Sequence, residues 1–261
     1  MTIDSTPPNG SPQPALSIVV PAYQEASTIE QALVRMRDEF DRLHRPYELL
    51  LISDGNVDGT EVAAARVEFP QMQICHYTPN RGKGYALRYG FERAHAPVVA
   101  FIDADLDIHP SCVRDLLAQL EATGVDAVIG SKVHPLSTVQ YPRFRRFQSR
   151  VFRLLIRSLF RLDVADTQTG CKVFRREVLD TCLPRVRSEG YLLDLELLVL
   201  ANDAGYRVVE GPIILDYQFA TSTGVSAVRE MLREVAGLAR RRRASRRAGT
   251  WITPRTANRG S

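Results

Sequence analysis

The chain has 261 residues, 44% apolar and 25% charged, which is enough to bury the core of one α/β domain or two small ones. Its formal net charge is +4, its four cysteines form no C-x-x-C pair, and no apolar stretch approaches the ~18–20 residues that span a bilayer. We therefore expect no integral membrane protein, secreted disulfide scaffold or zinc finger, and the cysteine usage fits a reducing compartment.

The first hundred residues alternate between strand and helix patterns. Short apolar runs predict strands at 16–20, 47–52, 72–77 and 98–102. Apolar residues at spacings of three and four predict helices at 29–43, 62–67 and 83–94. This alternation predicts a single α/β domain with a mostly parallel sheet flanked by helices, whose ligands bind beyond the carboxyl ends of the strands.

The domain is expected to cover residues 15–222. A polar, proline-rich segment at 1–14 is predicted to be a disordered tail. An amphipathic, basic segment is expected at 223–247, followed by a second disordered tail at 248–261.

Three carboxylates stand where the chain leaves the fourth predicted strand, at Asp103, Asp105 and Asp107. In extended backbone such alternate residues point the same way, so we expect them to converge. Their mutual repulsion would raise their pKa values, and a hard divalent cation such as Mg²⁺ or Mn²⁺ relieves it. The alternative is a set of turn and helix-cap aspartates ahead of Pro110.

Six short blocks then follow one another in a characteristic order. They are VVPAYQE (19–25), ISDGNVDGT (52–60), NRGKGYALR (80–88), DAD (103–105), GSK (130–132) and DTQTGCK (166–172). Together they resemble the family 2 glycosyltransferases with a GT-A fold, in particular the dolichyl- and polyprenyl-phosphate mannose and glucose synthases. The resemblance covers roughly residues 15–235.

The resemblance implies an inverting transfer of a hexose from UDP-glucose or GDP-mannose to a polyprenyl or dolichyl phosphate. It assigns residues to four roles. Donor binding falls to Pro21, Tyr23, Glu25, Asp54 and Asp103; metal binding to Asp103, Asp105 and Asp107; acceptor-phosphate binding to Lys132, Arg145 and Ser149; and catalysis at the reacting sugar to Asp105, Asp194 and Glu196.

Two departures from the family pattern stand out. The usual Asp-Asp-Gly-Ser is here Ser-Asp-Gly-Asn at 53–56, and the segment 216–223 lacks the basic pair that relatives often carry around a serine. The membrane helices that some relatives append are not expected either. The missing basic pair and the missing membrane helices favour a rival hypothesis, in which the donor chemistry is the same but the acceptor is a soluble or peptide hydroxyl.

Cations and a base are also needed for this chemistry. The chain has only three lysines, Lys83, Lys132 and Lys172, each close to a glycine inside a block. Lys83 is the best candidate for a donor-side cation, because Gly82 and Gly84 allow backbone to approach an anion. A hydroxyl acceptor would need a general base, and Asp194 is the first candidate. Glu196 would lie on the same face as Asp194 only if this segment is extended.

Positive charge is concentrated in two arginine-rich segments, seven arginines in 143–161 and six in 240–247. The arginines at 146, 150, 153, 157 and 161 fall on one helical stripe, which suits a helix lying on an acidic membrane surface. The alternative is a helix packed on the acidic remainder of the domain. We expect a cytoplasmic, peripheral-membrane enzyme that binds no nucleic acid; a non-catalytic protein that docks on anionic lipid is the rival from another class.

Overall fold

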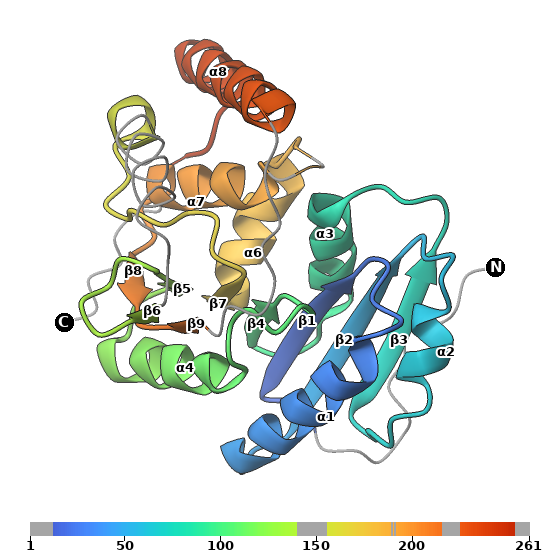
Figure 1. Cartoon of the computed structure of the whole chain (residues 1–261). Helices are drawn as coiled ribbons and strands as arrows, with labels where there is room; N and C mark the ends of the chain where they lie inside the picture. Colours follow the sequence, from blue (N-terminus) through green and yellow to red (C-terminus); the bar gives the residue numbers. More distant parts are fainter. Residues whose placement is uncertain (1–12, 140–155, 189, 191, 216–224, 254–261) are drawn as a thin grey trace.

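The computed structural model describes residues 13–139, 156–188, 190, 192–215 and 225–253. They form a seven-stranded sheet in the order β3-β2-β1-β4-β7-β5-β8, and a small sheet of β6 and β9 (Figure 1). The strands are β1 (Leu16–Ala22), β2 (Tyr47–Asp54), β3 (Met72–Tyr77), β4 (Val98–Ile102), β5 (Ala127–Gly130), β6 (Thr138–Val139), β7 (Cys171–Arg175), β8 (Val208–Gly211) and β9 (Ile214–Leu215).

The large sheet is parallel except for β7. Strands β1, β2, β3 and β4 pair in parallel, as do β5 and β8, whereas β7 lies antiparallel between β4 and β5. The predicted single α/β domain with a mostly parallel sheet is therefore confirmed. All four strands predicted from apolar runs are present.

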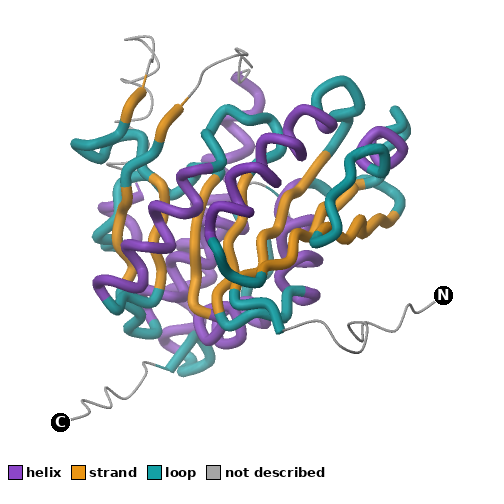
Figure 2. Tube along the Cα trace, turned by 90° about the horizontal axis from the view of Figure 1, so that it is seen from below, coloured by secondary structure: helices purple, strands orange, loops and turns teal. Residues whose placement is uncertain are grey.

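Helices cover both faces of the sheet, as Figure 2 shows in a view turned by 90°. They are α1 (Ile29–Phe40), α2 (Thr60–Ala64), α3 (Lys83–Arg93), α4 (Ser111–Thr123), α6 (Arg176–Cys182), α7 (Leu193–Asp203) and α8 (Val225–Arg247), with short 3-10 turns at Asp41–Leu43 and Leu183–Arg185. Side chains of α1, α2 and α4 share one apolar core, and those of α3, α6 and α7 share the other.

Successive side chains along each central strand belong alternately to these two cores. In β4, Val99 and Phe101 join the core under α3 and α7, while Ala100 and Ile102 join the core over α1 and α4. Because successive side chains of a strand point to opposite faces, a strand buried on both faces reads as a continuous apolar run. This is why the strands were recognisable in the sequence.

The basic C-terminal segment is a helix, α8, that packs on the domain. Its Val235 and Leu238 are buried in the core that contains α7, next to which α8 lies in Figure 1. Asp203, at the end of α7, accepts hydrogen bonds from Arg242 and Arg246 and from the indole of Trp251. Arg242 and Arg246 of this arginine-rich segment therefore pair with an acidic group of the domain.

Most of the other predicted arginine stripe lies outside the described residues. Residues 156–160 are helical, with Ile156 and Phe160 buried and Arg157 exposed. Arg161 already has a left-handed backbone (φ 55°) and lies beyond the helix. In the part of the chain that the structure describes, no helix has both the length and the apolar character needed to cross a bilayer.

Candidate active site

The carboxyl ends of β1 and β2 continue into two loops that are tied together. The backbone N–H of Glu25 donates to the Thr60 hydroxyl (3.0 Å), and that of Ala26 donates to Asp58 (3.0 Å). The Asn56 amide donates to the carbonyl of Ala22 (3.2 Å). Two of the blocks read from the sequence thus form one wall at this edge of the sheet.

Asp54 ends β2 and joins that wall to the loop before α3. Its buried carboxylate accepts hydrogen bonds from the Asn80 amide (3.0 Å) and from the backbone N–H of Arg81 (2.7 Å). The next residue, Gly55, has φ +62°, and a Cβ there would lie 2.2 Å from the backbone nitrogen of Asn80. Only glycine lets the two loops approach so closely.

Asp103 lies directly after β4 and pairs with Lys83 at the first turn of α3. The ammonium of Lys83 is 2.6 Å from one carboxylate oxygen of Asp103 and 2.7 Å from the other. Burial lowers the pKa of Lys83, but Asp103 and Asp194 outweigh it and the net pKa is raised. Lys83 therefore stays charged, and the two predicted donor-side residues lie together.

Gly170, just before β7, closes the other side of Asp103. The Asp103 N–H donates to the Gly170 carbonyl (3.0 Å), and a Cβ on Gly170 would lie 1.9 Å from an Asp103 carboxylate oxygen. Since β7 runs antiparallel to β4, the start of β7 meets the end of β4. The block at 166–172 reaches the site in this way.

The backbone after Asp103 is not extended, which corrects the geometric premise for the three carboxylates. Leu106 has a left-handed backbone (φ 59°), and the Asp107 N–H donates to the Asp105 carboxylate (3.0 Å). The acidic groups still interact: desolvation and the nearby Asp103 charge raise the pKa of Asp105 to about 6. A turn, not an alternating strand, brings them near one another.

Behind Asp103 lies a buried ion pair between β7 and α7. Lys172 is fully buried, donates to the Thr169 carbonyl (2.7 Å) and lies 3.4 Å from the Asp194 carboxylate. Its ammonium is also 4.8 Å from the centre of the Phe101 ring. Burial lowers the pKa of Lys172, and the charge of Asp194 opposes that shift. This contact attaches Asp194 to the same cluster as Asp103 and Lys83.

Glu196 has other partners, because its segment is helical. One oxygen of this fully buried carboxylate accepts the backbone N–H groups of Arg187 (3.1 Å) and Ser188 (2.8 Å), and the other is 3.1 Å from Arg241 on α8. The sequence placed Glu196 beside Asp194 only for an extended segment. The helix turns it towards α8 and away from Asp194.

The predicted acceptor-phosphate residues are only partly in view. Lys132 follows β5, its backbone N–H donates to Asp166 (2.9 Å), and its charge acts on Asp107. Arg145 and Ser149 lie outside the described residues. On the donor side, Pro21 is half-buried in β1, Tyr23 is 47% exposed, and Glu25 accepts a hydrogen bond from the Thr28 hydroxyl (2.6 Å).

Comparison with known proteins identifies the architecture around this cluster. Residues 17–183 match the family described as "Glycosyl transferase family 2", which is more than half of the chain and includes β1 to β7. The chain belongs to glycosyl transferase family 2.

Curated relatives of this family 2 chain include glycosyltransferases from three domains of life. It is 33% identical over 222 residues to Glycosyltransferase AglD of Haloferax volcanii (83% of this chain, 35% of that protein). It is 30% identical over 204 residues to polyprenol monophosphomannose synthase of Mycolicibacterium smegmatis (75% of each). It is 29% identical over 227 residues to dolichyl-phosphate beta-glucosyltransferase of Saccharomyces cerevisiae (76% and 66%). The chain thus spans only about a third of the Haloferax protein.

Solved structures confirm the GT-A fold. Glucosyl-3-phosphoglycerate synthase from Mycobacterium tuberculosis, in complex with UDP, matches with a TM-score of 0.64 at 21% identity, over 87% of this chain and 79% of that one. The same enzyme in complex with Mn²⁺, UDP and phosphoglyceric acid matches with a TM-score of 0.62. At this level of identity the likeness shows the fold.

The acidic residues of this family 2 site fit a divalent cation that is shared with a ligand. In the described part of the chain, no three side chains of the usual ligand types are arranged to hold a metal ion by themselves. Mg²⁺ commonly binds one or two carboxylates together with substrate phosphates. Asp103 and Asp105, whose charges interact, supply that number of oxygen ligands.

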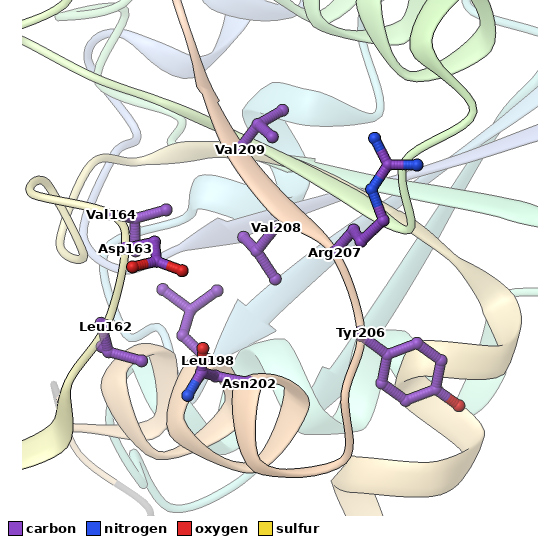
Figure 3. A pocket seen from close by; sticks show the side chains of 9 residues that line it. All are labelled: Leu162, Asp163, Val164, Leu198, Asn202, Tyr206, Arg207, Val208 and Val209. Atoms are coloured by element: carbon purple, nitrogen blue, oxygen red, sulfur yellow. The ribbon is translucent and has the colours of Figure 1, made fainter. Parts of the chain in front are cut away.

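Two cavities lie away from this cluster. A cavity of about 310 Å³ is formed by residues 162–164, α7 and the strand β8 at the sheet edge. Figure 3 shows Leu162 and Asp163 on one side of it and Tyr206 and Arg207 on the other. None of the predicted site residues lines it.

Proposed function

We propose that this protein transfers a hexose from a nucleotide-diphosphate sugar to a polyprenyl phosphate, with inversion at the sugar. The observation that carries the proposal is the convergence of Asp103, Lys83 and Asp194 at the carboxyl edge of the sheet. Relatives named as polyprenol monophosphomannose synthase and dolichyl-phosphate beta-glucosyltransferase support the acceptor class. UDP-glucose and GDP-mannose are both candidate donors.

Each residue of the donor side has a role that follows from its chemistry. Breaking the sugar–diphosphate bond leaves negative charge on the departing nucleotide. Lys83, which is held charged beside Asp103, would bind that diphosphate. Asp103 and Asp105 would hold Mg²⁺ or Mn²⁺, which supplies Lewis-acid stabilisation of the same charge. Asp54, with Pro21, Tyr23 and Glu25, would receive the nucleoside.

The acceptor side favours an anionic nucleophile over a hydroxyl. A lipid phosphate is ionised at neutral pH and attacks without losing a proton, so it needs no general base. Asp194 faces the buried Lys172 at 3.4 Å, which commits one of its oxygens to an ion pair. Asp194 would then orient the sugar, and Lys132, with Arg145 and Ser149, would hold the acceptor phosphate.

A peripheral position on an anionic membrane would give access to such an acceptor. Exposed arginines would supply positive charge for it, namely Arg157 in the helix at 156–160 and Arg240 on α8. Flotation with vesicles containing anionic lipid, repeated in rising salt, tests this point. Binding that does not weaken as salt increases would reject an electrostatic attachment.

The transfer reaction is tested with a panel of radiolabelled donors, polyprenyl phosphate and Mg²⁺ or Mn²⁺. We expect label from one donor to pass into the organic solvent phase. Label that enters a product but stays in the aqueous phase would replace the lipid acceptor by a soluble hydroxyl acceptor. No transfer from any donor, with retained vesicle binding, would favour the non-catalytic lipid-binding alternative.

A further inference from the structure

A second cavity lies where the C-terminal part of α8 adjoins the segment that precedes α7. It has a volume of about 160 Å³ and lies between the 3-10 turn Leu183–Arg185, the C-terminal part of α8 and the turn that follows. Arg185, Arg187, Arg241, Ser245, Thr250 and Trp251 line it. None of these residues belongs to the proposed donor or acceptor site.

Positive charge around this cavity is not balanced. Of the three guanidinium groups, only that of Arg241 has an acidic partner among the described residues, Glu196 at 3.1 Å. Arg185 donates to the Thr181 carbonyl (2.8 Å), which is uncharged. By contrast, Arg242 and Arg246 on the same helix both pair with Asp203. A concave surface lined by charges of one sign concentrates counter-ions.

Arg241 also carries an unused donor. Its Nε atom is buried and has no hydrogen-bond acceptor among the described residues. Nearly all buried donors in folded proteins have an acceptor, so this atom needs one that the described residues do not supply, such as an ordered water or a bound ion. Here the atom belongs to a residue that lines the cavity.

The remaining lining groups favour a phosphate group over other anions. The Ser245 hydroxyl adds a donor beside the guanidinium groups, whose planar forks match phosphate oxygens. The Thr250 hydroxyl already donates to the Ser245 carbonyl (3.5 Å). The indole N–H of Trp251 already donates to Asp203 (2.8 Å), so Trp251 offers the cavity its ring. The volume accommodates a phosphate group with several waters, each of which occupies about 30 Å³.

We propose that this cavity is a second anion site, separate from the Asp103 site, which binds a phosphate group. The phosphate can come from a small soluble molecule or from a phospholipid headgroup. The proposal does not depend on sugar transfer, because it concerns residues outside the site assigned to that reaction.

The chain contains its own probe, because Trp251 is the one tryptophan in the sequence. Inorganic phosphate is titrated at constant ionic strength, with chloride as the balancing salt, while Trp251 fluorescence is recorded. We expect a saturable change, with a dissociation constant at least tenfold higher in Arg187→Gln. Arg243→Gln is the matched control, since Arg243 is exposed on α8 and does not line the cavity.

Vesicles distinguish the two phosphate sources. The same fluorescence is measured with phosphatidic acid vesicles and with phosphatidylcholine vesicles. A fluorescence change with phosphatidic acid vesicles alone, lost in Arg187→Gln but kept in Arg243→Gln, assigns the site to a lipid headgroup. A saturable fluorescence response to inorganic phosphate assigns it to a soluble ligand. No response to either, or equal losses in Arg187→Gln and Arg243→Gln, would overturn the proposal.

Discussion

Asp103 has contacts on two sides, with Lys83 in front and Gly170 behind. Replacing Asp103 by Asn keeps its shape but removes the charge that holds Lys83 and a cation. We expect Asp103→Asn to lower transfer by about 10²–10³-fold, the size usual for loss of one preorganised electrostatic group. Divalent-cation binding, measured by Mn²⁺ titration, should fall in parallel.

Asp115→Asn is a suitable control for that variant. Asp115 lies on α4, is exposed, and pairs with the neighbouring Arg114 (3.4 Å). If Asp103→Asn kept wild-type transfer and Mn²⁺ binding, as Asp115→Asn should, the proposed role of Asp103 would be excluded.

Asp105 should make the stability of the metal-free protein depend on pH. Desolvation and Asp103 raise its pKa from 3.8 to about 6, so its charged form destabilises the fold. This cost is absent below pH 4, grows as pH rises, and is complete above pH 6. Asp105→Asn should therefore raise the urea midpoint at pH 7.5 in chelator and leave it unchanged at pH 3.5. An equal shift at both pH values would contradict the assignment.

Lys172 and Asp194 should behave as one unit. Removing either charge leaves the other buried without its partner, which costs about 3–5 kcal/mol for a typical buried pair. We expect Lys172→Met to lower the free energy of unfolding strongly. The double variant Lys172→Met/Asp194→Asn should recover part of that loss. Chemical denaturation of the two single variants and the double variant measures the coupling, and additive effects would show that the pair does not interact.

The sequence predicted the cluster better than it predicted its contacts. The sequence identifies Asp103 because it follows an apolar strand, Lys83 because it is one of only three lysines and lies between two glycines, and Asp54 through the family resemblance. The pairing of Lys172 with Asp194 was not predicted, since it depends on the direction of β7. The position of Glu196 depended in the same way on whether its segment is helical.

At the level of elements, the chain that enters β7 leaves no room for a side chain beside Asp103. A methyl group on Gly170 would collide with Asp103, so Gly170→Ala should displace that carboxylate and reduce transfer by at least tenfold. Gly237 lies in α8, where a Cβ would meet only the end of Arg241, at 3.8 Å. Gly237→Ala should keep full activity and raise the free energy of unfolding by about 0.5–1 kcal/mol. Assays of both variants, with thermal unfolding, check the pair.

The elements themselves were predictable where one signal dominated. Apolar runs located β1 to β4 to within two residues at each end, although the edge strand β3 is only partly buried. β7 was not predicted, because Cys171–Arg175 contains a buried lysine and was read only as a motif. The convergence of the carboxylates was predicted from an extended chain, whereas a left-handed residue at Leu106 turns it.

At the level of the whole molecule, Asp203 attaches α8 to the rest of the domain. Its side chain is 3% exposed and accepts hydrogen bonds from Arg242, Arg246 and Trp251. Asp203→Asn should lower the free energy of unfolding by about 3–5 kcal/mol, because two guanidinium groups lose their partner. Arg240→Gln, at an exposed position on α8, should change it by less than about 0.5 kcal/mol. Equal stability of the two variants would show that this network contributes nothing.

The place of β7 between β4 and β5 sets the order in which the protein can be completed during translation. About 70 residues are synthesised after β4 before β7 emerges to pair with it. At roughly 5–20 residues per second, that leaves one edge of β4 open for several seconds. The nascent chain must keep this edge from pairing with another strand, and Asp103 meets Gly170 only once the second half of the domain has left the ribosome.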